Sequence, residues 1–171
     1  EAAHKLLSKI TVSTINYLKM QIQSGANLVQ IFDSWAGILS PEQYSIFGIP
    51  YLQKICEAIT EAPKIVFAKG AHFALDDLSK LNCEVLGIDW NIQINKAKIA
   101  IGEDKVIQGN LDPAVLYADK ETIIAKTTKM LDEFGPEKHI ANLGHGVYPD
   151  TPLDGVKWFI ETVKSHQYQM A

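Results

Sequence analysis

The chain has 171 residues, enough for one domain with its own core but fewer than the roughly 250 of a complete (β/α)8 barrel. Charged residues make up 21% of the sequence and the net charge is -4, so we expect no nucleic-acid-binding surface, which would need a basic patch. No apolar run approaches the roughly 20 residues of a membrane span, and no signal peptide opens the chain. We therefore expect a cytoplasmic protein with no membrane partner.

Two features of the composition bear on the substrate and on the extent of the chain. All 16 basic residues are lysines. Arginine binds clustered carboxylates bidentately, so a polyanionic substrate would be held here by lysines and backbone N–H groups, or by arginines outside this chain. A lysine-biased genome explains the absence equally well. Because the chain opens on Glu1 rather than Met, we expect an N-terminal segment to be missing. Cys56 and Cys83 stand in separate segments and form no CxxC pair, which is typical of a reducing compartment.

The predicted helices follow from apolar spacing and capping residues. Apolar residues recur at helical spacing from Leu6 to Ile22, and Gly25 ends this helix. Ser40-Pro41-Glu42-Gln43 predicts a second helix start, because serine caps and proline fits the first turn. We expect that helix to break at Pro50 and to continue to about Glu61. Further helices are expected over 74–81, 92–101 and 119–134, and from Thr151-Pro152 to about His166.

Short apolar runs between these helices predict five strands, over 28–32, 64–68, 84–88, 105–108 and 139–142. Strands that alternate with helices pair in parallel through right-handed crossovers. The pattern therefore predicts an α/β fold of about five βα units, three fewer than an eight-unit barrel. A doubly wound open sheet is the alternative, but no GxGxxG follows the first strand and the chain has no P-loop.

Polar residues follow each predicted strand, where α/β barrels bind their ligands. In chain order they are Asp33 and Ser34, Lys69 and His72, Asp89, Asn110 and Asp112, and Asn142 and His145. Together they predict one side of an active site. Individually several have simpler interpretations: Asp112 caps a helix, Asp33 caps a turn or pairs with a lysine, His72 is a satisfied rim histidine, and Asp89 holds another loop.

His145 carries the strongest individual signal because Gly144 and Gly146 flank it. Glycines let the backbone approach a ligand closely and adopt a positive φ. Imidazole donates hydrogen bonds to carboxylates and exchanges protons near neutral pH. We predict a direct functional role for His145.

Five sequence blocks, in order along nearly the whole chain, resemble the uroporphyrinogen decarboxylase family. They are Ile31-Phe32-Asp33-Ser34-Trp35-Ala36-Gly37, Phe67-Ala68-Lys69-Gly70-Ala71-His72, Leu86-Gly87-Ile88-Asp89-Trp90, Gln108-Gly109-Asn110-Leu111-Asp112-Pro113 and Asn142-Leu143-Gly144-His145-Gly146-Val147.

The resemblance implies that residues 1–171 are the C-terminal part of a single TIM-barrel domain, about its last five βα units. It implies a lyase of porphyrin and haem biosynthesis that converts uroporphyrinogen III to coproporphyrinogen III by removing four acetate carboxyl groups, without metal or organic cofactor. Ser34 and His145 would bind substrate carboxylates, and His145 would also act catalytically in proton transfer. Phe32 would lie against the tetrapyrrole, and His72, Asp89 and Asn110 are further candidates for the rim.

The resemblance also implies what lies outside the chain. The family's carboxylate-binding arginines, its central aspartate and a site tyrosine come from the N-terminal half of the barrel. We therefore expect that half as a partner and a homodimer as the native assembly, and we expect the 171-residue chain alone to be inactive.

Two rival functions remain at this point. Zinc-dependent methylcobamide–thiol methyltransferases are related barrels that bind zinc through a His-x-Cys pair and a later cysteine. Here His72-Phe73-Ala74 and Gly144-His145-Gly146 stand at those places, and the cysteines fall elsewhere. The second rival is a non-catalytic half-barrel that binds tetrapyrrole or serves in assembly, because exposed sheet edges invite pairing with another chain.

Overall fold

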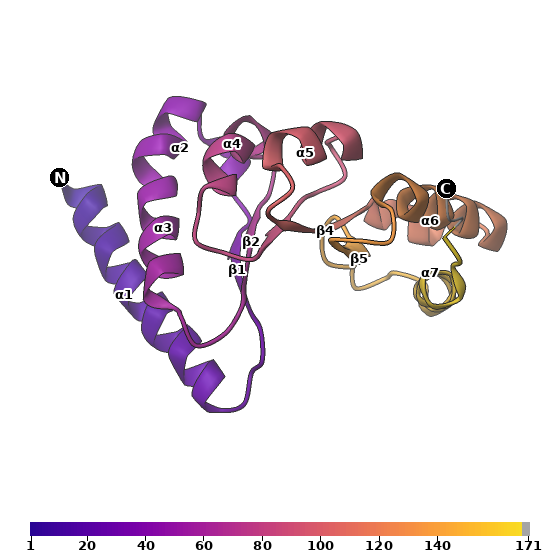
Figure 1. The fold of residues 1–171 in the computed structure, drawn as a ribbon, viewed down its shortest axis with the longest axis horizontal. Coiled ribbons are helices and arrows are strands. Elements are labelled where there is room, and N and C mark those ends of the chain that lie inside the picture. The colour runs from indigo at the N-terminus through magenta and orange to yellow at the C-terminus, as the bar shows by residue number, and fades with distance from the viewer. Residues whose placement is uncertain (169–171) are drawn as a thin grey trace. The chain divides into compact units, whose positions relative to one another are not determined.

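The computed structural model describes residues 1–168, in which helices and parallel strands alternate along the chain (Figure 1). The strands are β1 (Val29–Asp33), β2 (Lys64–Ala68), β3 (Val85–Gly87), β4 (Val106–Leu111) and β5 (His139–Leu143), in sheet order β1-β2-β3-β4-β5. The α-helices are α1 (Ala2–Gln23), α2 (Pro41–Phe47), α3 (Ile49–Ala58), α4 (Leu75–Ser79), α5 (Ile94–Ile101), α6 (Lys120–Phe134) and α7 (Leu153–Ser165). Three short 3-10 helices complete the order: η1 (Ala36–Ile38), η2 (His72–Ala74) and η3 (Pro113–Tyr117). The predicted α/β fold is confirmed.

The chain divides into two compact units, one of residues 1–86 and 100–105 and the other of residues 87–99 and those from 106 onward. In the first unit β1 and β2 pair in parallel, with Val29 opposite Lys64 and Phe32 opposite Phe67. Every residue of β2 is buried. In the second unit β4 pairs in parallel with β5, and α6 packs against α7.

The strands form where the apolar runs predicted them, and β2 has the predicted bounds. The break between α2 and α3 falls at Gly48, so the prediction of Pro50 was wrong. A Cβ at Gly48 would lie 2.4 Å from Cε2 of Tyr44, so the backbone turns where that ring packs against it. Pro50 lies in the first turn of α3, where its missing N–H costs nothing.

The last helix begins as predicted, but not by the predicted cap. Pro152 occupies the N-cap position of α7 and makes no side-chain cap bond. The Thr151 hydroxyl instead accepts a hydrogen bond from the backbone N–H of Tyr148 at 3.0 Å. This contact shapes the preceding turn.

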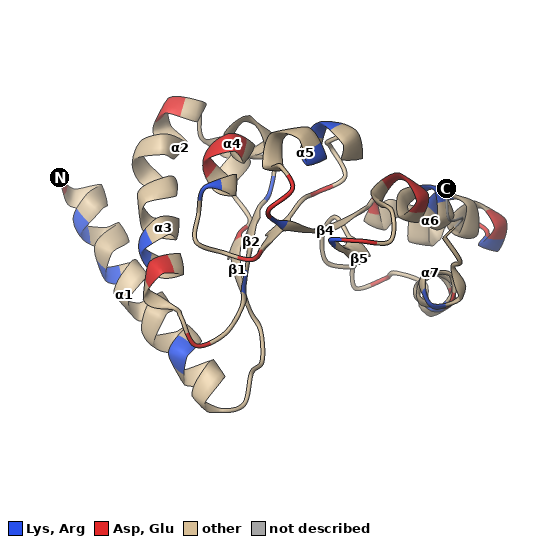
Figure 2. Cartoon of the chain, viewed as in Figure 1, with Lys and Arg blue, Asp and Glu red and all other residues tan. Residues whose placement is uncertain are grey.

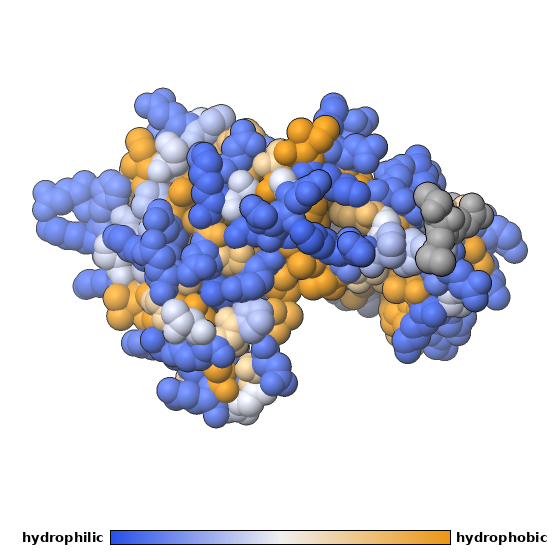
Figure 3. All heavy atoms as spheres, in the orientation of Figure 1, coloured by the Kyte–Doolittle hydropathy of each residue, from blue (hydrophilic) through white to orange (hydrophobic). Residues whose placement is uncertain are grey.

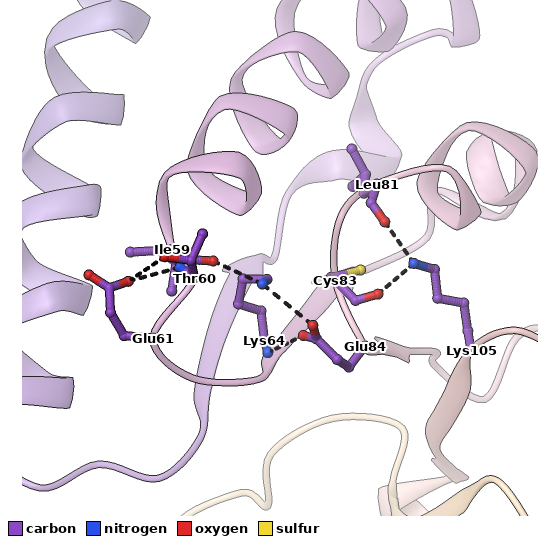
Figure 4. A network of polar contacts seen from close by, with 8 residues as sticks. All are labelled: Ile59, Thr60, Glu61, Lys64, Leu81, Cys83, Glu84 and Lys105. Carbon is purple, nitrogen blue, oxygen red and sulfur yellow. Dashed lines mark hydrogen bonds and ion pairs between the residues drawn. The ribbon is translucent and has the colours of Figure 1, made fainter.

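Two hydrogen-bonded lysines lie near the amino ends of β2 and β3 in the first unit (Figure 4). Lys64 is 3% exposed, and its Nζ donates to the Ile59 carbonyl at 2.9 Å and lies 3.5 Å from Oε1 of Glu84. Nζ of Lys105 donates to the carbonyls of Leu81 and Cys83. The buried charge of Lys64 is therefore hydrogen-bonded, as a buried ion must be.

Charged positions of both signs are interspersed along the helices (Figure 2). None of the helices within residues 1–168 combines the length and apolar character that crossing a membrane requires. Apolar surface also shows between the hydrophilic side chains (Figure 3). Helix α1 contributes exposed apolar side chains at near-helical spacing: Leu6, Ile10, Tyr17 and Met20.

Candidate functional site

The carboxyl end of β1 presents an aromatic ring and a hydroxyl group to solvent. The Phe32 side chain is 67% exposed, and its ring meets the edge of Phe67 on the neighbouring strand, with centroids 6.2 Å apart. Ser34 is exposed in the turn that follows. Both predicted substrate-binding residues of this unit are therefore accessible to a ligand.

Asp33, between them, accepts a hydrogen bond from a side chain of α2. The Tyr44 hydroxyl donates to Oδ2 of Asp33 at 2.9 Å. Tyr44 is 1% exposed, and its ring meets the edge of Phe73, with centroids 6.0 Å apart. The donor to Asp33 is therefore a residue 11 positions along the chain, which neither sequence interpretation of Asp33 had named.

Burial is the largest cause of the pKa shifts of both Asp33 and Tyr44. It raises the pKa of the Asp33 carboxyl, and the hydrogen bond from Tyr44 opposes that rise. Burial also raises the pKa of the Tyr44 hydroxyl, and the charge and hydrogen bond of Asp33 raise it further. The tyrosine therefore remains a donor at any physiological pH.

The turn after β1 is fastened to the turn after β2. The Asp33 carbonyl accepts from the backbone N–H of Lys69 at 3.1 Å, and the Lys69 carbonyl accepts from that of Gly37 at 2.8 Å. Gly37 lies directly against Gly70, since a Cβ at Gly37 would stand 2.8 Å from the Gly70 Cα. His72 follows, half-buried, at the start of η2.

A groove of about 700 Å³ opens beside β1 in the same unit. It is lined mainly by apolar side chains of α1, α2 and α3, together with Phe32, Asp33 and Trp35. The exposed residues of the β1 turn therefore border a concave surface.

In the second unit, two predicted rim residues hold a loop in place. Asp89 is 1% exposed, and its Oδ1 accepts from the backbone N–H of Asn91 at 2.8 Å. Asn110 is buried on β4, and its Nδ2 donates to the carbonyls of Asp89 and Ile92 at 3.0 and 3.1 Å. The structure therefore brings Asp89 and Asn110 together, and their contact with a substrate stays a prediction.

His145 follows β5, half-buried, with its ring perpendicular to that of Trp90 and the centroids 6.5 Å apart. A Cβ at Gly144 would lie 2.6 Å from the backbone nitrogen of Trp90, so no larger residue fits there. Gly146 has nothing within 4 Å of such an atom, and neither glycine has a positive φ. The expectation of positive φ was wrong; close packing explains Gly144 instead.

Two further sequence interpretations meet the structure. Asp112 caps η3, its Oδ1 accepting from the backbone N–H of Ala114 at 2.9 Å, as the simpler interpretation predicted. Cys56 lies in α3 and Cys83 precedes β3, so they belong to separate segments as predicted; the fold nevertheless brings the two buried thiols together, and Cys56 donates a hydrogen bond to Cys83. That bond raises the pKa of Cys56 and lowers that of Cys83.

Sequence reasoning missed Tyr44 and the pairing of Trp90 with His145. Helical spacing marks Tyr44 as a buried ring, but only the fold shows that its hydroxyl meets Asp33. Within residues 1–168, no three His, Cys, Asp or Glu side chains gather closely enough to share a metal ion, so the described residues give no support to the zinc interpretation.

Comparison with known proteins gives a consistent set of relatives. The model of the uroporphyrinogen decarboxylase (URO-D) family matches residues 1–166. The uroporphyrinogen decarboxylase of Schizosaccharomyces pombe is 45% identical over 183 aligned positions, which cover 100% of this chain and 50% of that protein. The enzyme of Christiangramia forsetii is 43% identical, in an alignment that covers 97% of this chain and 49% of that protein. The enzyme of Homo sapiens is 39% identical, over 97% of this chain and 48% of that protein. The chain spans about half the length of the curated relatives it matches.

A solved methyltransferase from Methanosarcina mazei has a similar backbone, with a TM-score of 0.80 over 90% of this chain and 46% of that chain. At 24% sequence identity this likeness concerns the fold alone.

Proposed function

The chain belongs to the uroporphyrinogen decarboxylase family, and from that membership we propose that the whole protein removes the four acetate carboxyl groups of uroporphyrinogen III to give coproporphyrinogen III. The family is a TIM barrel, of which the chain covers about half. The observation that carries the proposal is the 39–45% identity to uroporphyrinogen decarboxylases along nearly the entire chain.

The substrate itself accepts the electrons in this reaction. Protonation of a pyrrole ring carbon makes the ring electron-poor, the bond to the carboxylate then breaks, and its electron pair enters the ring as CO2 leaves. A second proton adds to the exocyclic carbon to give the methyl group, and the ring carbon then releases the first proton, which restores the aromatic pyrrole. The protein must bind several carboxylates, stabilise a cationic ring and supply protons, which is electrostatic preorganisation with general acid catalysis.

We assign Ser34 and His145 to the substrate carboxylates, His145 to proton transfer as well, and Phe32 to the tetrapyrrole face. Support comes from the exposure of Ser34 and the 67% exposure of Phe32 at the end of β1. The half-buried imidazole of His145 stands at the corresponding end of β5. His72, Asp89 and Asn110 are the further candidates.

Substitutions in the full-length enzyme test these roles. Ser34→Ala removes a hydrogen bond to a charged group, worth about 1.5–3 kcal/mol, so KM should rise roughly ten- to hundredfold. Ser45→Ala on α2 is the matched control, since this exposed serine donates its hydroxyl to the Glu42 carbonyl in its own helix turn. Steady-state rates of coproporphyrinogen formation give both constants.

His145→Ala should lower kcat/KM by roughly a hundredfold or more, the range of general acid–base catalysis. His145→Gln keeps a hydrogen-bond donor but exchanges no proton near neutral pH, so it separates binding from proton transfer. Wild-type kcat/KM in both His145 variants would remove this residue from the site.

The partners and surroundings of the chain belong to the same proposal. Residues 1–171 form the C-terminal part of one barrel domain, which the N-terminal half completes, and two such barrels form a homodimer in the cytoplasm. The exposed apolar side chains of α1 support a covering partner. The buried thiols of Cys56 and Cys83 are free, as suits a reducing compartment.

A further inference from the structure

The turn that carries Ser34 is held by a buried hydroxyl. Tyr44 on α2 is 1% exposed, and its hydroxyl reaches Oδ2 of Asp33, the residue before Ser34, at 2.9 Å. For packing alone a phenylalanine ring would serve here, since the hydroxyl adds a polar group that must be satisfied. The hydroxyl therefore has a task that concerns Asp33.

The Asp33 residue is held at a second point, through its backbone. Its carbonyl accepts from the Lys69 N–H at 3.1 Å, while the Lys69 carbonyl accepts from the Gly37 N–H at 2.8 Å. The contact between Gly37 and Gly70 closes the other end of the turn. Side-chain and backbone bonds together thus fix the orientation of the turn between Asp33 and Gly37.

Tyr44 is itself held rigidly. Its ring packs against Gly48, where a Cβ would stand 2.4 Å from Cε2, and meets the Phe73 ring edge-on with centroids 6.0 Å apart. Helix α2 starts with a capped turn, in which the Ser40 hydroxyl accepts from the Gln43 N–H at 3.2 Å. Because the ring is fixed in this way, the Tyr44 hydroxyl holds the Asp33 carboxylate at a fixed position relative to α2.

We propose that Tyr44 and Asp33 are positioning residues that hold the Phe32–Ser34 segment in the one orientation in which its serine hydroxyl and aromatic ring meet the tetrapyrrole substrate. The inference rests on the proposed function, because it assigns Tyr44 and Asp33 to the same substrate-binding turn. Neither residue needs to touch the substrate: Tyr44 acts through Asp33, and Asp33 through the turn that it begins.

Tyr44→Phe in the full-length enzyme removes only the hydroxyl. We expect KM for uroporphyrinogen to rise roughly tenfold, the factor that corresponds to about 1.4 kcal/mol, with kcat changed less than twofold. Tyr51→Phe is the matched control, since it removes another buried hydroxyl of the same unit, which lies 2.7 Å from Nδ1 of His4. This control should leave KM unchanged.

Variants of Asp33 test the same bond from the other side. Asp33→Asn retains an oxygen acceptor for Tyr44 and should keep KM within about threefold of wild type, whereas Asp33→Ala should raise KM as Tyr44→Phe does. Because both single variants break one bond, the double variant Asp33→Ala/Tyr44→Phe should raise KM no further. An unchanged KM in Tyr44→Phe, or additive effects in the double variant, would overturn the proposal.

Amide hydrogen exchange separates this inference from the enzymatic assignment. In Tyr44→Phe the amides of residues 33–37 should exchange faster, while those of β2 remain as in wild type. If the amides of Tyr44→Phe exchange faster but the wild-type enzyme shows no decarboxylase activity, the proposed function is refuted and the role of Tyr44 in holding the turn stands. If exchange in Tyr44→Phe equals that of wild type and the wild-type enzyme is active, the positioning role alone is refuted.

Discussion

At the scale of single residues, His139 shows how packing sets a protonation state. Its Nε2 lies 2.7 Å from the Gly109 carbonyl, so Nε2 carries the proton and donates it. Its ring stacks on Phe134, with centroids 3.7 Å apart. Burial lowers the pKa of His139; the bond to Gly109 opposes this, and the charge of Lys98 adds to it.

The folded protein should therefore lose stability as the solution becomes mildly acidic. The pKa of His139 is below its ordinary value of 6.5 in the folded state, so the unfolded state binds the proton first. The stabilising contribution is complete above pH 6.5 and is lost as the pH falls through the folded-state pKa. Urea unfolding at several pH values should show a smaller loss in His139→Gln than in wild type. Equal losses in the two proteins would contradict the assignment.

The glycines on either side of His145 should tolerate substitution very differently. In Gly144→Ala the new Cβ meets the Trp90 backbone at 2.6 Å, and overpacking of this kind costs about 1–3 kcal/mol. Gly146→Ala meets nothing within 4 Å and should be nearly neutral. Thermal unfolding compares the two, and equal melting temperatures would show that the loop relaxes around the methyl group.

At the scale of elements, the N-terminal turn of α2 depends on one hydroxyl. The Ser40 Oγ accepts from the Gln43 N–H at 3.2 Å, and loss of such a cap costs about 1 kcal/mol. Ser40→Ala should lower the midpoint of urea unfolding, while Ser40→Asp, which also caps, should retain it. A midpoint unchanged in both variants would show that water replaces the cap.

The elements were largely predictable because their signals are local. Apolar periodicity located α1, and the fully buried run of β2 was found at its exact bounds, 64–68. The break at Gly48 and the role of Thr151 were not found, because both depend on a contact with another part of the chain, namely the Tyr44 ring and the Tyr148 backbone.

The site was predictable in outline and not in its internal bonds. Strand-end position made Ser34 and His145 candidates, because α/β barrels bind ligands at the carboxyl ends of their strands, and the family resemblance added Phe32. The same rule placed Asp89 and Asn110 on the rim, although both are buried and bond to backbone groups. Sequence position shows which residues stand at a strand end, but the direction of each side chain depends on neighbours distant in sequence.

At the scale of the whole molecule, we expect catalysis to need the N-terminal half of the barrel as well as this chain. The 171 residues alone should show no decarboxylation, because the arginines expected to bind the substrate carboxylates are not among them. Addition of the separately expressed N-terminal half should restore activity. Activity of the isolated chain would refute this prediction, whereas tetrapyrrole binding by the restored pair without turnover would favour a binding module.

The contact between Gly37 and Gly70 has a consequence for attempts to redesign substrate preference. The atoms nearest to an added Cβ at Gly37 are backbone atoms of Gly70 and Lys69, and Gly70 has a φ of +73°, so a side chain at either position would strain the backbone. Trp35 and Ile38, both 74% exposed in the same turn, carry no such restriction. A library directed at the turn after β1 should therefore keep Gly37 and its contact partner Gly70, and randomise the exposed positions Trp35 and Ile38, where variation leaves the backbone of the turn intact.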